Sequence, residues 1–191
     1  MMYGYYSEMS DSELWSLFLS GDKKALSYIY KNQYHQLLSY GIKLYPDYEV
    51  VRDCIQDLFV KLYLNHKKLS PTLNINAYLL RSLKNRLYDV LSDKKDISSL
   101  DETLAFDFTI DEEFFLQFPD NDDIDLQKKK KLHEIIHMLP SRQQEILYLR
   151  FVRELDYVEI GEILGINYQS AKNLLSRSLA KIRKVFFSDK K

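Results

Sequence analysis

The stretch DYVEIGEILGINYQSAKNLLSRSLAKIRKVFF, residues 156–187, decides the fold of this chain. Asp156 is a good helix N-cap, and Glu159 follows it at the spacing of a capping box. Gly165 can adopt the left-handed conformation that ends a helix. Asn167 is then a suitable N-cap for a second helix. We therefore expect two helices joined by a turn that is too short to be anything but rigid.

The second of these helices has two different faces. When successive residues are placed about 100° apart, its apolar side chains fall on one side. The side chains expected to face the core are Ala171, Leu174, Leu175, Ile182, Val185 and Phe186. The other side carries amides, hydroxyls and cations and no carboxylate, which favours a polyanion as its partner.

Together these features predict a helix-turn-helix whose second helix enters a DNA major groove. Gly161 removes a side chain where the second helix can cross the first closely. The simpler alternative is a basic surface helix on an ordinary helical protein. The residues expected to contact DNA are Gln169, Ser170, Lys172, Asn173, Ser176, Arg177, Arg183 and Lys184.

The composition is that of a folded, all-helical protein. Hydrophobic residues make up 46% and charged residues 29% of the 191 residues, and 5 Gly and 4 Pro occur with almost no alternating β pattern. The single cysteine, Cys54, excludes an intramolecular disulfide framework and indicates a reducing compartment. The N-terminus has no secretory signal pattern, and no apolar run is long enough to span a membrane. We expect a cytoplasmic protein without membrane insertion.

The charge is distributed in blocks that suggest two domains and a linker. Residues 1–92 carry 11 basic and 9 acidic side chains, residues 93–127 carry 2 and 12, and residues 128–191 carry 14 and 7. Such blocks indicate separate roles. We expect two small helical domains at 1–92 and 128–191, joined by an acidic, flexible linker at 93–127.

Helical apolar spacing gives the expected elements of both domains. A first helix opens at Ser10-Asp11, and Ser141 with Gln144 has the spacing of a capping box. The helices expected are at about 11–20, 22–44, 47–64, 77–92, 128–139 and 141–152, before the two described above.

Two polar faces in the first domain are candidates for binding. Asp53, Gln56 and Asp57 lie off the apolar stripe of the third helix. On the fourth helix, basic groups interleave with an amide and an aromatic ring, which suits contact with unstacked bases and phosphates. The residues of this second face are Arg81, Lys84, Asn85, Tyr88 and Asp89.

Two motifs suggest metals but do not fit them well. His133, Glu134 and His137 match the H-E-x-x-H pattern of zinc hydrolases, and Glu159 or Glu162 could supply a third ligand. Those glutamates belong to the helix-turn-helix, however, and the chain lacks the mass for a substrate cleft. DNDDID at 120–125 lacks the glycine and the final glutamate of a calcium loop. We expect no metal and no cofactor.

Three motifs in order resemble the bacterial RNA polymerase sigma factors of the sigma-70 family, in their compact extracytoplasmic-function (ECF) group. DCIQDLFVKLY at 53–63 resembles region 2.2, NINAYLLRSLKNRLYDVLS at 74–92 resembles regions 2.3–2.4, and 139–184 resembles region 4. The two resembling blocks, 14–92 and 128–187, cover most of the chain. They leave no room for the extra domains of housekeeping sigma factors.

The resemblance implies roles for particular residues. Asp53, Gln56, Asp57 and Phe59 would dock on the β′ clamp helices of core RNA polymerase. A second set would open and read the −10 element, the set being Asn76, Arg81, Lys84, Asn85 and Tyr88. Region 4 would read the −35 element and contact the β flap. The resemblance also implies an anti-sigma factor, often membrane-bound, as a further partner.

The sequence therefore favours a sigma factor that binds polymerase and promoter DNA and is not an enzyme. One alternative is a conventional helix-turn-helix regulator with residues 1–92 as a sensor or dimerisation domain. The other is a zinc hydrolase that uses His133, Glu134 and His137.

Overall fold

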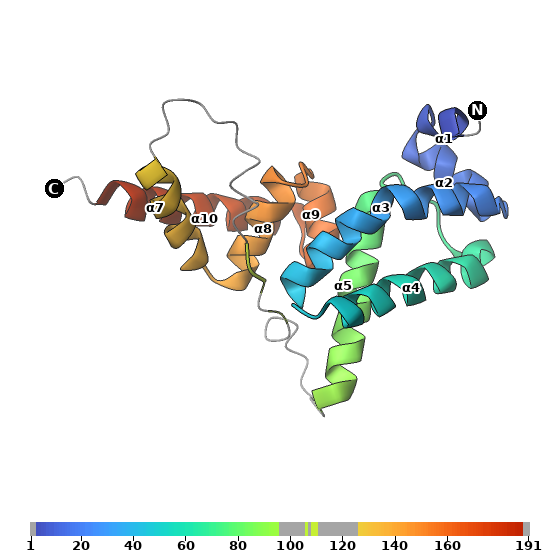
Figure 1. The fold of residues 1–191 in the computed structure, drawn as a ribbon. Coiled ribbons are helices and arrows are strands. Elements are labelled where there is room, and N and C mark those ends of the chain that lie inside the picture. Colours follow the sequence, from blue (N-terminus) through green and yellow to red (C-terminus); the bar gives the residue numbers. More distant parts are fainter. Residues whose placement is uncertain (1–2, 96–105, 107, 111–125, 189–191) are drawn as a thin grey trace. The chain divides into compact units, whose positions relative to one another are not determined.

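A computed structural model describes residues 3–95, 106, 108–110 and 126–188 (Figure 1). Within these ranges the chain is helical and contains no strand, as expected for an all-α protein. Contacts divide it into two compact units, residues 1–105 and 106–191. In the part of the chain that is described, no helix combines the length and apolar character needed to cross a bilayer.

The first unit is a helical bundle in which α3 and α4 start at aspartate caps. The Asp22 carboxylate accepts hydrogen bonds from Lys24 and Ala25 and begins α3, and Asp47 caps α4 in the same way. Ser10 and Glu13 form a full capping box at α2. The elements are α1 (Tyr3–Ser7), α2 (Asp11–Leu19), α3 (Lys23–Leu44), α4 (Tyr48–Asn65), η1 (His66–Lys68) and α5 (Ile75–Lys95). The short α1 was not expected from the sequence.

The core of the first unit forms where α3, α4 and α5 pack on one another, with α2 laid across α3 and α5. Trp15 is fully buried, and its ring meets Tyr78 edge-on at 5.0 Å. Its indole N–H donates to the Ser70 carbonyl at 3.0 Å, which fixes the loop before α5. These contacts therefore hold α5 and the loop before it against α2.

The second unit is built around α10 (Tyr168–Ser188), which packs against α7 (Leu126–His137), α8 (Ser141–Phe151) and α9 (Tyr157–Leu164). The structure confirms the caps predicted for the helix-turn-helix. Asp156 and Glu159 form a complete capping box, and Gly165 ends α9 with a φ of 64°. The Asn167 side chain accepts from the Ser170 N–H at 2.8 Å.

Two local predictions in the second unit were wrong. Pro140, not Ser141, is the N-cap of α8, and no side chain caps this helix. Gln144 is instead buried, with its amide donating to the Leu139 carbonyl at 3.0 Å. Val185 was expected to face the core, but it is 39% exposed, whereas the next residue, Phe186, is half-buried beneath Lys131 of α7.

The second unit also includes residues that the sequence assigned to the linker. Phe108 is 1% exposed and Ile110 is fully buried, and both belong to the core that α8 helps to form. The domain boundaries at residues 92 and 128 stay a prediction. The second compact unit begins well before residue 128.

Candidate nucleic-acid and protein interfaces

The polar face of α10 is exposed as the sequence predicted. The helix contains no acidic residue along its 21 positions. Seven of the eight predicted DNA contacts are exposed and Ser170 is half-buried, the exposed ones being Gln169, Lys172, Asn173, Ser176, Arg177, Arg183 and Lys184. Lys181 is a further exposed cation that the sequence interpretation omitted. This face suits a polyanion because nothing on it repels phosphate.

Hydrogen bonds along the first turns of α10 orient part of this face. The Gln169 amide donates to the Asn173 side-chain oxygen at 3.0 Å, one turn further on. The Arg177 Nε–H donates to the Asn173 carbonyl at 3.3 Å, so its stem runs back along the helix. Two linked amides with a guanidinium beside them provide donors and acceptors suited to base edges and phosphates.

Contacts within the second unit hold α9 and α10 at a fixed angle. A Cβ built on Gly161 would lie 2.6 Å from the Ile166 carbonyl oxygen. The close approach predicted at this glycine is therefore made by the turn that precedes α10. The Arg142 guanidinium also donates to the Leu164 carbonyl at 3.1 Å, at the end of α9.

In the first unit, the predicted polymerase-docking residues lie along α4. Asp53, Gln56 and Asp57 are exposed. Phe59 is 8% exposed and packs edge-on against Tyr30 at 4.9 Å between ring centroids. This contact packs α4 against α3, and the docking role of Phe59 stays a prediction.

Asp57 is tied to α5 by an ion pair. The Arg86 guanidinium donates to the Asp57 carboxylate at 2.6 Å, and this hydrogen bond raises the pKa of Arg86. Asp53 is bonded within its own helix, to Arg52 at 3.3 Å, and Arg52 also pairs with Glu49. Asp57 thus connects the acidic face of α4 to α5.

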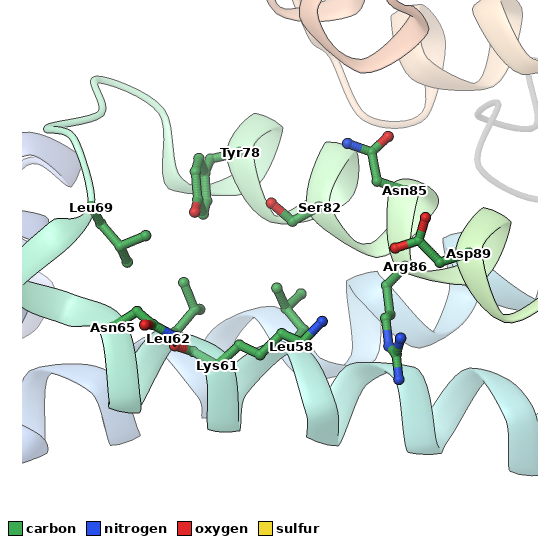
Figure 2. A pocket seen from close by; sticks show the side chains of 10 residues that line it. All are labelled: Leu58, Lys61, Leu62, Asn65, Leu69, Tyr78, Ser82, Asn85, Arg86 and Asp89. Atoms are coloured by element: carbon green, nitrogen blue, oxygen red, sulfur yellow. Dashed lines mark hydrogen bonds between the residues drawn. The ribbon is translucent and has the colours of Figure 1, made fainter.

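Arg86 also lines a groove of about 350 Å³ between α4 and α5 (Figure 2). Tyr78, Ser82 and Arg86 lie on the side of α5 that faces α4, with Asn85 at the edge. The remaining lining residues are Leu58, Lys61, Leu62, Asn65, Leu69 and Asp89. An apolar floor with polar sides and open access suits a planar, polar ligand such as a base.

The structure brings only part of the predicted −10 set to this groove. Asn85 lines it, whereas Arg81 is exposed on the neighbouring side of α5 and Lys84 and Tyr88 are half-buried. Asn76 is half-buried, and its side-chain oxygen has no hydrogen-bond partner in the described residues. The sequence interpretation missed Tyr78, Ser82 and Arg86, although their positions at i, i+4 and i+8 were a usable signal.

His133 and His137 lie one turn apart on α7, with their Nε2 atoms 2.9 Å from each other. Across the described ranges, no three His, Cys, Asp or Glu side chains are grouped so as to hold a metal ion. Neither Glu159 nor Glu162 therefore completes a site with these histidines, and the hydrolase alternative gains no support. The 120–125 segment lies outside the described residues.

These features define a class: a two-unit helical protein with a helix-turn-helix in one unit and a polar, two-helix groove in the other. Comparison with protein families narrows it. The family model for sigma-70 region 2 matches residues 29–97, and the one for sigma-70 region 4 matches residues 129–182. Together they span more than half of the chain, in the family's order.

Individual relatives agree with this result. The RNA polymerase sigma factor SigZ of Bacillus subtilis is 26% identical over 155 residues, covering 81% of this chain and 83% of SigZ. The ECF RNA polymerase sigma factor SigW of the same organism is 25% identical over 160 residues, covering 82% and 84%.

Solved structures share the fold. CnrH, in complex with the cytosolic domain of CnrY, superposes with a TM-score of 0.57 at 16% identity, covering 94% of this chain and 98% of CnrH. RpoE of Bartonella quintana, in complex with the anti-sigma factor NepR, gives 0.53 at 19%, covering 88% and 98%.

The chain belongs to the sigma-70 family of RNA polymerase sigma factors, in its ECF group. It directs promoter recognition and transcription initiation. The match to both family regions favours this function over that of a conventional regulator, which needs only the helix-turn-helix.

Proposed function

We propose that this sigma factor divides its work between the two units along the surfaces described above. Asp53, Gln56 and Asp57 on α4 dock on the β′ clamp helices of core polymerase. Phe59 keeps these residues in place, because its ring packs against Tyr30 and so holds α4 on α3. This assignment rests on the exposure of the three polar residues on one helix face.

The groove between α4 and α5 holds melted, non-template bases of the −10 element. Asn85 and Arg81 remain the main predicted contacts, with Lys84, Tyr88 and Asn76 beside them. Tyr78 adds an aromatic ring at the groove wall, and base–aromatic stacking contributes about 1–3 kcal/mol per base. The polar side chains of Ser82 and Arg86 then offer hydrogen bonds to a base edge or a phosphate.

The helix-turn-helix of the second unit places α10 in the upstream major groove, at the −35 element. Gln169, Ser170 and Asn173 face base edges from the first turns. The cations along the helix hold phosphates, namely Lys172, Arg177, Arg183 and Lys184, with Ser176 beside them. The observation that carries the proposal is this exposed, carboxylate-free helix, in a chain whose other unit carries the polar groove.

The mechanism is binding and strand capture without chemistry of its own, and it takes place in the cytoplasm, where polymerase works. RpoE of Bartonella quintana is bound by an anti-sigma factor in its solved complex. We propose that an anti-sigma factor likewise sequesters this chain, and that the β flap of polymerase contacts its region 4.

The test is reconstitution with core polymerase. Purified chain is expected to bind the core enzyme and to direct run-off transcripts from selected members of a random promoter library. An Asp53→Ala, Gln56→Ala double variant tests the docking surface, because both side chains are exposed and neither supports the core. It should bind core polymerase at least about tenfold more weakly, about 1.4 kcal/mol, while keeping its fold. A chain that joins the core without selecting any start site would contradict the proposal.

A further inference from the structure

A short stretch of the acidic connection is fixed on the second unit. The Phe108 ring lies 5.5 Å from the Tyr148 ring of α8, and both side chains are buried. The Ile110 N–H donates to the Gln144 side-chain oxygen at 3.2 Å. Thr109, between them, is exposed, as expected for an extended segment that presents alternate side chains to a core.

The Gln144 side chain is well placed to hold this segment. It is 5% exposed, and its amide nitrogen donates to the carbonyl of Leu139, in the turn between α7 and α8, and to that of His137, the last residue of α7. Its oxygen is thereby aimed at Ile110. A buried amide satisfied on both sides is costly to release, because each buried group left unpaired costs about 1–3 kcal/mol.

This attachment shortens the length of chain that limits the distance between the two units. Phe108 comes thirteen residues after Lys95, the last residue of α5. A chain of that length spans at most about 45 Å, whatever its conformation. Without the attachment, the free connection would run from Lys95 to Leu126, thirty-one residues later, with a limit of about 110 Å.

We propose that Phe108, Ile110 and Gln144 form a linker anchor that sets the length of the tether between the two promoter-reading units. The inference rests on the proposed function, since it assigns this anchor the role of restricting the spacing between −10 and −35 elements. The length of chain between Lys95 and Phe108 then limits the reach between the units, whereas the length of chain between Ile110 and Leu126 does not enter that limit.

Two matched insertions, one on each side of the anchor in the sequence, test it. A six-residue Gly/Ser segment is inserted between residues 100 and 101 in one variant, and between residues 118 and 119 in the other. Each adds at most about 20 Å of chain, equivalent to about six base pairs of DNA. Both are assayed with core polymerase on promoters whose −35 to −10 spacing varies by single base pairs.

The upstream insertion is expected to broaden the spacing profile, raising transcription at spacings two or more base pairs from the optimum by about threefold relative to the optimum. The downstream insertion should leave the profile of the natural chain unchanged. Equal effects of the two insertions, or no effect of either, would overturn the anchor.

A second measurement separates this inference from the proposed function. Hydrogen exchange at the Ile110 amide is followed in the free chain, with no polymerase or promoter present. Protection like that of buried amides in α8 supports the anchor, and exchange at the rate of an unstructured peptide overturns it. If the natural chain directs no transcription at any spacing, the proposed function fails and the amide still decides the anchor.

Discussion

The two units present their functional side chains in different ways. In the second unit the candidate DNA contacts lie on one helix, α10, and are fixed by its own 3.6-residue period. In the first unit the groove is shared by α4 and α5, and the Asp57–Arg86 ion pair joins them across 29 residues of sequence. The surface on α10 depends on the turn that joins α9 to α10, whereas the groove depends on how α4 and α5 pack against each other.

This difference teaches where each surface is vulnerable. In both units a buried glycine allows another segment to approach closely, but the neighbours differ. Gly161 faces the backbone carbonyl of Ile166, and Gly41 on α3 faces the Val51 side chain of α4. A backbone carbonyl cannot rotate away, whereas a side chain has some freedom to adjust.

The largest expected effect is that of Gly161→Ala. The new methyl group meets the Ile166 carbonyl, so we expect a loss of about 2–3 kcal/mol in the stability of the second unit. Trp15 is the single tryptophan and is buried in the first unit, so its fluorescence reports on that unit alone. Thermal unfolding followed by circular dichroism should shift, and the fluorescence transition should not.

Gly41→Ala is the matched change in the first unit. It should lower the stability of the first unit by about 1–2 kcal/mol, which the Trp15 fluorescence transition reports. The new methyl group meets the buried Val51 side chain, which can adjust more than a backbone carbonyl can. A fluorescence shift in the Gly161→Ala variant would show that the units do not unfold independently, and would break the comparison.

The next effect sharpens the division of labour within α10. Arg177→Ala should weaken upstream binding on all sequences and reduce its salt dependence, since a phosphate contact carries no base information. Asn173→Ala should instead change the preference at one or two base pairs, by about 1–3 kcal/mol. Binding to a panel of single-base −35 variants at two salt concentrations measures both. Equal losses on every sequence from both changes would contradict this division.

A smaller effect tests the link between the two helices of the groove. Arg86→Ala and Asp57→Ala should each lower the stability of the first unit by up to about 1 kcal/mol, because both side chains are partly exposed. The double variant should lose less than the sum of the two, since each single change already breaks the pair. Asp53→Ala is the control, because Asp53 is bonded to Arg52 on its own helix. Additive losses in urea unfolding would show that the ion pair does not join the helices.

The smallest effect concerns the turn between α8 and α9. Glu154 has a φ of 55°, and within the described residues it is the one non-glycine residue with a positive φ. Glu154→Gly should stabilise the second unit slightly, by about 0.5 kcal/mol, because relief of the left-handed strain is partly offset by the greater freedom of glycine when unfolded. A small upward shift in the circular dichroism transition, with no change in Trp15 fluorescence, is the expected result.

The helix-turn-helix was predictable from sequence because its signals are local. Asp156, Glu159, Gly165 and Asn167 act within a few residues of themselves, and the structure confirms each cap. The capping box predicted at Ser141 does not form, because contacts distant in the sequence decide where Gln144 lies. Its motif has the right spacing, but Gln144 finds a buried position among the Leu139 and Ile110 backbone groups that no local pattern encodes.

The sequence alone determined the helical class, the caps, the polar face of α10 and the family to which the chain belongs, because these depend on spacing along one segment. The tertiary structure decided that Phe59 is buried, that Asp57 holds Arg86, and that Phe108 and Ile110 join the second unit. Each of these depends on contacts between residues far apart in the chain, and the free energy of such contacts is settled by packing and desolvation in the folded state.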